Sequence, residues 1–391
     1  MGVTWRSRLV FPYLVLSALI GSVHLILPAA LALLPLPFAR PRRAYRGAVR
    51  CVARAWFTLA ASLLERESAV HVSGQLPAPA DRCTLMLCNH NSRVDWMYIW
   101  VLVARYGTSA DLRIALKSSL RSAPFFGWAM QAFLFVFLSR HNRERDLTEI
   151  RDVLGYVVHT LHEPTSFLLF PEGTDLSPSN LKKAKAWAAA HGRPQFHHLL
   201  QPRSAGFIET VRAMGDALDA VYDITVTYTL SGGTAADKPE SAAADDPSTV
   251  SYTPLRPSEV DMLRGRFPEA VRLHMHRYSR SELPTSDEAL AQWLEERWRA
   301  KESFITAALA AQASSLDEAV VQPVADYARF RLLWGVASVV VVLGFTIVPI
   351  LPLPTIIGCV LLAIATRFWG GLGAIEMATT PRAITREVKH T

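Results

Sequence analysis

Two long uncharged stretches, one near each end of the chain, limit the folds that it can adopt. Residues 9–39 contain no Asp, Glu, Lys or Arg, and a single histidine interrupts their apolar character. A helix needs about 20 apolar residues to cross the hydrocarbon core of a bilayer, so this stretch is long enough to span it. Pro28, Pro35 and Pro37 are expected to bend or end the helix. The sequence therefore predicts a membrane anchor with a basic flank over residues 1–50.

A cleaved signal peptide is the alternative interpretation, because Ala30-Leu31-Ala32 resembles a cleavage site. The apolar core of a signal peptide is only about 7–15 residues long, which favours a retained helix. Many more arginines follow the stretch than precede it, and the positive-inside rule then predicts that most of the chain is cytosolic. Those that follow are Arg40, Arg42, Arg43, Arg46, Arg50 and Arg54, against Arg6 and Arg8 before the stretch.

The second uncharged stretch covers residues 332–366. Pro349, Pro352 and Pro354 divide it into two pieces that are each short for a full span, which predicts a helical hairpin in the membrane over residues 330–370. A hairpin returns the basic C-terminal tail to the side that it left. A buried hairpin in the core of a soluble domain is the alternative.

Composition agrees with membrane association and with an anionic partner. Of 391 residues, 50% are hydrophobic and 19% are charged, and the formal net charge is +7. Soluble domains carry about 25% charged residues. A positive chain suits phosphorylated metabolites, anionic lipids or nucleic acid. The four cysteines lack zinc-finger spacing, and nothing in the sequence resembles a disulfide-stapled secreted scaffold.

Between its two ends the chain reads as globular. Residues 84–88 and 166–170 are short apolar runs typical of buried strands, and residues 220–229 alternate as another strand does. Helical stretches separate these strands, which predicts a layered α/β domain over residues 60–230. Residues 231–253 are polar and read as a loop or linker. We expect a helical extension over residues 254–310.

The first candidate site directly follows the strand at residues 84–88. His90 leaves this strand and Asp95 lies five residues later, so the carboxylate can hold the imidazole in one tautomer and stabilise its protonated form. No serine or cysteine nucleophile is needed if the proton comes from a substrate hydroxyl. Taken alone, this spacing also fits an ordinary surface hydrogen bond.

Three further segments end predicted strands in the same way. Residues 170–174 (Phe-Pro-Glu-Gly-Thr) combine a glycine, which lets a ligand approach the backbone, with a threonine hydroxyl suited to a phosphate. Arg140 and Arg203 each follow an apolar run, and a guanidinium is a natural fork for a phosphate. Individually these are also an ordinary turn and two solvated arginines.

Together the four segments resemble the glycerolipid acyltransferases, specifically the 1-acylglycerol-3-phosphate acyltransferase group. The motifs of that family are matched here by His90-x4-Asp95, by Arg140, by residues 170–174 and by Pro202-Arg203. Further similarity, at Lys117 and within residues 267–285 for example, is to the lysocardiolipin and longer eukaryotic lysophosphatidate acyltransferase branch. The resemblance covers roughly residues 80–305, too much for chance.

The resemblance implies an acyltransferase domain with a mixed sheet flanked by helices, plus N-terminal and C-terminal transmembrane helices. It implies that His90 is the general base on a free glycerol hydroxyl and that Asp95 orients it. The phosphate or glycerol end of the acceptor would be held by Arg140, Glu172, Gly173, Thr174, Pro202 and Arg203. Lys117 is expected to join this cluster or to bind the phosphates of coenzyme A.

The expected reaction moves an acyl chain from acyl-CoA to lysophosphatidate, giving phosphatidate. Lysocardiolipin, lysophosphatidylglycerol and lysophosphatidylinositol are alternative acceptors, and an inactive lipid-binding protein on the same fold is a further alternative. A Gly-x-Ser-x-Gly elbow, which would indicate a serine hydrolase, does not occur in the sequence. No metal, redox cofactor or nucleic acid is expected as a partner. The resemblance implies the endoplasmic reticulum, with a mitochondrial membrane as the alternative.

Overall fold

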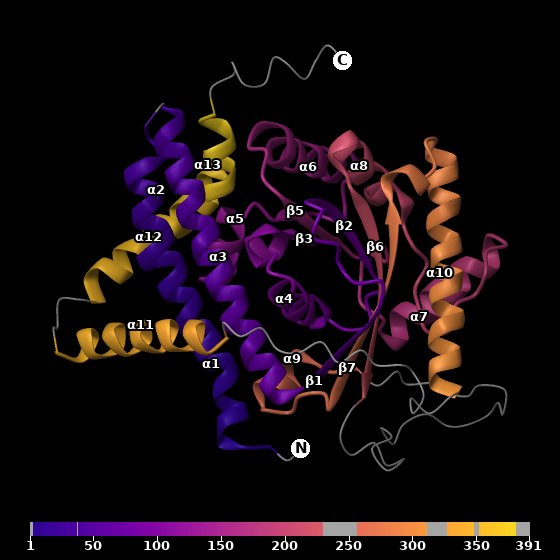
Figure 1. The fold of residues 1–391 in the computed structure, drawn as a ribbon, viewed down its shortest axis with the longest axis horizontal. Helices are drawn as coiled ribbons and strands as arrows, with labels where there is room; N and C mark the ends of the chain where they lie inside the picture. The colour runs from indigo at the N-terminus through magenta and orange to yellow at the C-terminus, as the bar shows by residue number, and fades with distance from the viewer. Residues whose placement is uncertain (1–2, 37, 230–255, 311–326, 348–351, 381–391) are drawn as a thin grey trace.

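A seven-stranded mixed sheet organises the middle of the chain (Figure 1). The computed structural model describes residues 3–36, 38–229, 256–310, 327–347 and 352–380. The strand order is β1-β7-β6-β2-β5-β3-β4, and β6 and β7 pair antiparallel whereas the other neighbours pair parallel. The strands are β1 (Ala69–Gly74), β2 (Cys83–Cys88), β3 (Leu112–Lys117), β4 (Val136–Leu138), β5 (Thr165–Leu169), β6 (Ala220–Thr229) and β7 (Ala270–Ser279). The predicted α/β class with a mixed sheet is confirmed.

Helices cover both faces of this sheet, which explains why the neighbouring central strands β2 and β5 are mostly apolar. Met86 of β2 packs in the core beneath the N-terminal helices, whereas its neighbours Leu85 and Leu87 pack in a second core on the opposite face. Alternate strand residues point to opposite faces, so a strand covered on both sides has no polar face. The covering helices are α3 (Ala39–Glu67), α4 (Asp95–Arg105), α5 (Phe126–Ala132), α6 (Arg143–Gly155), α7 (Pro178–Ala190), α8 (Ser204–Met214), α9 (Glu259–Leu263) and α10 (Asp287–Ala310).

The first uncharged stretch forms one nearly continuous helix that packs on the part of the molecule that contains the sheet. It consists of α1 (Trp5–Leu19), the π-helical segment η1 (Ile20–Ile26) and α2 (Leu27–Leu33). Pro28, expected to bend or end the helix, lies directly after the π turn, where the longer hydrogen-bond spacing accommodates its missing N–H. The helix ends before Pro35, as predicted.

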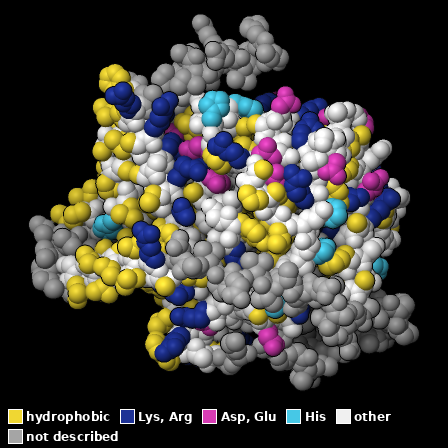
Figure 2. All heavy atoms as spheres, in the orientation of Figure 1, with side chains coloured by type: hydrophobic (Ala, Val, Ile, Leu, Met, Phe, Trp, Pro, Cys, Tyr) yellow, Lys and Arg dark blue, Asp and Glu magenta, His cyan; other side chains and the backbone are white. Residues whose placement is uncertain are grey.

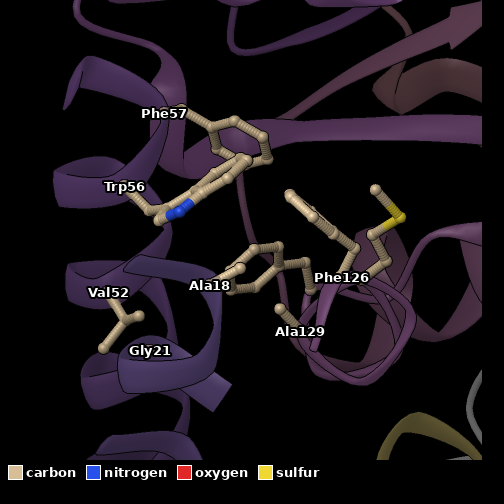
Figure 3. Close-up of a pocket in the computed structure, with 9 residues that line it drawn as sticks. Ala18, Gly21, Val52, Trp56, Phe57, Phe126 and Ala129 are labelled. Atoms are coloured by element: carbon tan, nitrogen blue, oxygen red, sulfur yellow. The ribbon is translucent and has the colours of Figure 1, made fainter. Parts of the chain in front are cut away.

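The N-terminal helices belong to the main core of the molecule. Val10, Leu14 and Ala18 of α1 are buried in the core cluster that also contains the sheet. In Figure 3, residues of α1, η1, α3 and α5 surround a cavity of only about 10 Å³, so these helices are closely packed. This packing favours the retained helix over a cleaved signal peptide.

Helix α3 returns antiparallel to α1 and carries the basic flank into the protein interior. The predicted boundary of the anchor at residue 50 falls in the middle of this helix. The Arg46 guanidinium donates to both carboxylate oxygens of Glu163 at 2.9 Å, and Arg50 pairs with Asp111 at 2.5 Å. These two arginines therefore bind carboxylates within the protein. The positive-inside rule counts arginines as charges that face the cytosol and does not consider such internal pairs.

The second uncharged stretch forms two helices, as predicted: α11 (Tyr327–Ile347) and α12 (Pro352–Trp369). Both are long enough to be candidate membrane spans, as are residues Trp5–Leu33 and Arg40–Glu67. Their apolar side chains are largely exposed, for example Leu332 (68%) and Ile356 (58%). Figure 2 shows this hydrophobic surface at the left of the molecule. The alternative of a buried soluble hairpin does not fit such exposure.

A last helix, α13 (Leu372–Ala378), ties this hairpin to the rest of the protein. Glu376 is fully buried, where its carboxylate accepts from Arg46 at 3.3 Å and from the Tyr156 hydroxyl at 3.1 Å. In the span itself, the Thr355 hydroxyl lies 3.2 Å from His24 Nε2. The C-terminal helices α12 and α13 thus contact the N-terminal elements η1 and α3 (Figure 1).

One expected element is corrected by the structure. The predicted helical extension over residues 254–310 does contain α10, but residues Ala270–Ser279 form β7, which completes the sheet between β1 and β6. Charged and histidine side chains alternate with apolar ones along β7, so a helical interpretation misread a strand with one polar face. Most of the predicted linker, residues 231–253, lies outside the described residues.

Candidate active site

The sheet topology brings the predicted site residues to one edge. Strands β2, β5, β3 and β4 are adjacent and parallel, so their carboxyl ends meet on the same side. His90 follows β2, residues 170–174 follow β5, Lys117 ends β3 and Arg140 follows β4. Open α/β sheets bind their ligands at this edge. These four positions, which lie far apart in the sequence, therefore meet at one edge of the sheet.

His90 and Asp95 form a direct pair. The distance from His90 Nδ1 to Asp95 Oδ2 is 3.0 Å, and Asp95 is the first residue of α4 and completely buried. A carboxylate at this distance accepts the Nδ1 proton, which leaves the lone pair of the neutral ring on Nε2. The ring of Phe170 stacks on the imidazole with 4.4 Å between ring centroids. Orientation and tautomer of His90 are thus both fixed.

Asp95 is itself held by two further donors. Its Oδ2 atom also accepts the backbone N–H of Ser92 at 2.8 Å, and its Oδ1 atom accepts the Tyr228 hydroxyl at 2.5 Å. Burial, and then the charge of Asp95, raise the pKa of Tyr228 well above its ordinary value, so this hydroxyl remains a donor. The sequence interpretation missed Tyr228, which lies on β6 and is separated from Asp95 by 133 positions.

Glu172 joins two loops of the site through its carboxylate. Its Oε1 atom accepts the backbone N–H of His90 and its Oε2 atom that of Leu200, each at 3.0 Å. The side chain is buried, and this burial raises its pKa to about 7 although both amide bonds act in the opposite direction. The resemblance implied that Glu172 holds the acceptor, whereas here its two oxygens bind protein backbone.

A cleft of about 570 Å³ opens in front of His90. Lys117, Arg140 and Thr174 line it together with His90, which brings four of the predicted residues to one cavity. Phe11 of α1 also lines the cleft, so the N-terminal apolar helix forms part of its wall. A cavity with a basic side and an apolar wall suits an amphiphile that carries a phosphate.

Arg140 lines this cleft, whereas the second motif arginine, Arg203, does not line it but lies close enough to Arg140 for the two charges to interact. Arg140 has a positive φ of 64°, and the Asp146 carboxylate holds its backbone N–H at 2.7 Å. Partial desolvation and then the like charge of Arg203 lower the pKa of Arg140. Two neighbouring cations that repel each other form a favourable place for an anion.

Gly173 and Pro202 shape the backbone around Arg203. A Cβ atom built on Gly173 would lie 3.6 Å from the Arg203 side chain, and the φ of Gly173 is +74°, which favours glycine. Pro202 precedes Arg203, whose backbone N–H donates to the Pro171 carbonyl at 2.8 Å. These contacts bring the third and fourth motifs together.

A charged network crosses the mouth of the cleft and was not foreseen from the sequence. Arg93 lies 3.1 Å from Glu259 of α9 and 3.7 Å from Asp175, and all three residues line the cleft. Arg256 pairs with Asp175 at 3.5 Å. The short segment around α9 is thereby fixed to the loops that carry His90 and Thr174.

Within the part of the chain that the structure describes, no group of three or more His, Cys, Asp or Glu side chains is arranged to hold a metal ion.

Because the arrangement at His90 supplies a base, an orienting carboxylate and nearby cations, it can remove a proton from a hydroxyl group beside a bound phosphate.

Comparison with known proteins extends this assignment. Residues 69–229 match the acyltransferase family and residues 261–307 match the acyltransferase C-terminus family. Lysocardiolipin acyltransferase 1 of Mus musculus is 34% identical over 304 residues, which is 77% of this chain and 73% of that protein. A probable 1-acyl-sn-glycerol-3-phosphate acyltransferase 5 of Arabidopsis thaliana is 30% identical over 255 residues, 64% of this chain and 60% of that protein.

Among solved structures, the crystal structure of the 1-acyl-sn-glycerophosphate acyltransferase of Thermotoga maritima matches with a TM-score of 0.43 and 20% identity. The match covers 76% of this chain and 96% of that one. The resemblance noted in the motifs extends, in the mouse lysocardiolipin acyltransferase 1, over 77% of this chain. The protein belongs to the acyltransferase family.

Proposed function

We propose that the protein transfers an acyl chain from acyl-CoA to the free glycerol hydroxyl of a lysophospholipid. The observation that carries this proposal is the pair of His90 and Asp95 in a cleft shared with Lys117 and Arg140. A base beside cations suits a hydroxyl that is attached, through a glycerol backbone, to a phosphate.

In the proposed reaction, His90 Nε2 takes the proton of the hydroxyl while its oxygen attacks the thioester carbonyl. The carbon–sulfur bond breaks, and the imidazolium returns the proton to the departing thiolate of coenzyme A. Asp95 stabilises the imidazolium between these two steps. A positioned base contributes about 10²–10⁴-fold to the rate, and alignment of the two amphiphiles in the cleft supplies much of the remainder.

We assign the phosphate of the acceptor to Arg140, Arg203 and Thr174, with Lys117 beside it or on the phosphates of coenzyme A. Glu172 is assigned a positioning role, because its two oxygens accept backbone N–H groups of the loops at His90 and Leu200. Gly173 and Pro202 set the backbone that lets Arg203 reach the site. No metal or redox cofactor enters the proposed reaction.

Lysophosphatidate is the first acceptor that we propose, in line with the motifs and with the names of the Arabidopsis relatives. A second candidate is a lysophospholipid whose phosphate carries a further polyol, such as lysocardiolipin, lysophosphatidylglycerol or lysophosphatidylinositol. Asp175 and Glu259 favour it, because they line the cleft and can accept hydrogen bonds from headgroup hydroxyls. The animal relatives carry the name lysocardiolipin acyltransferase.

We further propose that the protein resides in the endoplasmic reticulum with its catalytic half on the cytosolic side; a mitochondrial membrane is the alternative. The four apolar helices support membrane residence in either organelle.

The test is an acyl-transfer assay on purified membranes, with oleoyl-CoA offered against a panel of these lysophospholipids. We expect His90→Ala to abolish transfer, while His276→Ala, which changes an exposed histidine of β7, retains wild-type activity. The preferred lysolipid identifies the acceptor. Equal activity of the wild type and His90→Ala across the whole panel would overturn the proposal in favour of an inactive lipid-binding protein.

Arg203 can be tested separately. Arg203→Ala is expected to raise the apparent KM for the acceptor more than it lowers kcat, because the lost interaction is made in the bound substrate as well as in the transition state. Arg212→Ala, in the same helix but paired with Asp287, is the matched control. A variant that lowers kcat alone would contradict the assignment of Arg203 to the phosphate.

A further inference from the structure

A second cavity, separate from the catalytic cleft, lies between the N-terminal part of α1, the end of α3 and the beginning of α11. Its volume is about 570 Å³, similar to that of the cleft. Leu9 and Tyr13 of α1 contribute to its apolar wall. Trp5, at the entrance of α1, lines it as well and is 68% exposed.

Three arginines from three different helices line the same groove: Arg6 of α1, Arg66 of α3 and Arg331 of α11. All three are exposed, and none of the described residues that line the groove is acidic. Arg66 pairs at 3.0 Å with the carboxylate of Glu67, the next residue of α3, which does not line the groove. Arg6 lies over the Trp5 ring at 5.4 Å. The groove therefore combines an apolar wall with a net positive end.

The surroundings of this groove are those of a membrane surface. α1 and α11 belong to candidate membrane spans, and exposed apolar side chains such as Trp5 and Leu9 lie beside the arginines of the groove. In Figure 2, hydrophobic and basic side chains lie side by side over the lower end of α1. Tryptophan and arginine at the end of an apolar helix are typical of the interface between hydrocarbon and headgroups.

We propose that this groove binds one molecule of an anionic phospholipid of the surrounding bilayer. Its phosphate contacts the guanidinium groups of Arg6, Arg66 and Arg331, since planar guanidinium forks match phosphate oxygens. One acyl chain lies along the apolar wall at Leu9 and Tyr13. A zwitterionic phospholipid carries its own cation beside the phosphate and gains less from three arginines.

Bound lipid at this place connects to the catalytic cleft through α1. Leu9 and Tyr13 line the groove, whereas Phe11, between them in the sequence, lines the cleft on the other side of the helix. Helical residues two positions apart lie on different faces, so one helix wall separates the two cavities. A lipid that fixes the position of α1 also fixes this wall of the cleft, and turnover is expected to depend on the anionic lipid content.

The experiment measures binding of brominated phosphatidylglycerol and brominated phosphatidylcholine to the full chain in detergent micelles, by quenching of tryptophan fluorescence. The Trp5→Phe variant identifies the part of the quenching that reports on the groove. The combined variant R6Q/R66Q/R331Q is expected to bind phosphatidylglycerol roughly 10- to 100-fold more weakly, with little change for phosphatidylcholine.

The matched control is R40Q/R43Q/R54Q, which removes the same number of charges from exposed positions of α3 outside the groove. It should retain the phosphatidylglycerol affinity. Equal weakening by both triple variants would show only unspecific charge attraction and would overturn the proposal, as would no weakening by the groove variant. Leu9→Phe, which enlarges the side chain at the apolar wall without adding a tryptophan and keeps the arginines, should weaken binding of both lipids; unchanged binding would also contradict the proposal.

Lipid binding in the groove does not require the proposed acyl transfer at His90, so each proposal can be contradicted while the other stands. His90→Ala should retain full phosphatidylglycerol binding at the groove. Added phosphatidylglycerol in phosphatidylcholine vesicles should stimulate transfer by the wild type and not by R6Q/R66Q/R331Q, and equal stimulation of both would contradict the proposed link through α1.

Discussion

At the scale of single residues, His90 is oriented by groups that converge from separate parts of the chain. Asp95 holds Nδ1, Tyr228 holds Asp95, and Glu172 holds the backbone N–H of His90 itself. The first contact orients the imidazole directly, and the other two hold Asp95 and the His90 backbone in place. The geometry of the base therefore depends on β6 and β5 as much as on its own loop.

Tyr228→Phe should lower kcat roughly tenfold and leave KM within about a factor of two, because a hydrogen bond to a charged group contributes about 1.5–3 kcal/mol. Tyr222→Phe is the control: it also removes a tyrosine–carboxylate bond from β6, to Asp81 at 2.5 Å, but away from His90. Acyl-transfer kinetics of both variants provide the measurement. A Tyr228→Phe enzyme with wild-type kcat would refute the positioning role.

The raised pKa of Glu172 predicts that the free energy of unfolding depends on pH. Its pKa is about 7 in the folded protein against an ordinary value of 4.5. Between these two values the folded state holds a proton that the unfolded state has released, so the free energy of unfolding falls as the pH rises, by up to about 1.4 kcal/mol per pH unit. Glu172→Gln removes this contribution.

Thermal unfolding of the wild type and Glu172→Gln in detergent, from pH 5 to pH 7.5, provides the measurement. The wild type should lose more stability over this range than the variant does. Parallel curves for the two proteins would mean that Glu172 titrates at its ordinary value.

His90 and Asp95 could be proposed from the sequence because they lie within one turn of chain, and the motif order supported the proposal. Tyr228 could not, since no local pattern links it to Asp95 across 133 positions. Glu172 was selected for the right site, but a sequence does not indicate whether a carboxylate points to a ligand or to backbone amides.

At the scale of elements, the strands that were predicted are those buried on both faces. β2, β5 and β6 were recognisable from apolar runs or alternation, whereas β7 was not, because its histidines and arginines interrupt its apolar character. Asp146 lies in the first turn of α6, which begins at Arg143 with Asn142 as its N-cap, and its carboxylate accepts the backbone N–H of Arg140. Local helix or strand propensity does not indicate which side chains bind the backbone of another segment.

The close contact of α12 with the N-terminal helix can be tested by one substitution. A Cβ atom at Gly358 would lie 2.7 Å from Val23 Cγ1, so Gly358→Leu should force α12 away from η1. We expect a loss of about 2–4 kcal/mol in stability. Gly335→Leu on α11, where a Cβ atom meets nothing within 4 Å, should be nearly neutral. Equal melting temperatures of the two variants in detergent would contradict this packing.

At the scale of the whole molecule, hydropathy predicted apolar helices at both ends but not that the N-terminal one forms part of the core and of the cleft wall. Val10 and Leu14 face the protein, whereas Leu9 and Val15 are exposed, and all four are equally apolar. A hydropathy pattern does not distinguish a lipid-facing side chain from one that faces protein.

The contact of α13 with α3 predicts that the C-terminal tail and the catalytic half lie on the same side of the membrane. Epitope tags placed at residue 240 and after residue 391 should then be digested together by protease added to sealed vesicles, or protected together. Permeabilised vesicles serve as the control for accessibility. Digestion of only one tag in sealed vesicles would exclude a hairpin that returns to its starting side.

The bond between Arg46 and Glu376 also has a consequence for biosynthesis. The two residues are separated by 330 positions, and at about 5–20 residues per second the ribosome adds the glutamate roughly 16–66 s after the arginine. Glu163 follows Arg46 by 117 positions, so early in that interval Arg46 has neither carboxylate partner, and later it has only Glu163 of the two. Until α13 has been synthesised, Arg46 therefore lacks one of its buried carboxylate partners. Truncated products without α13 should be recognised and degraded by cellular quality control.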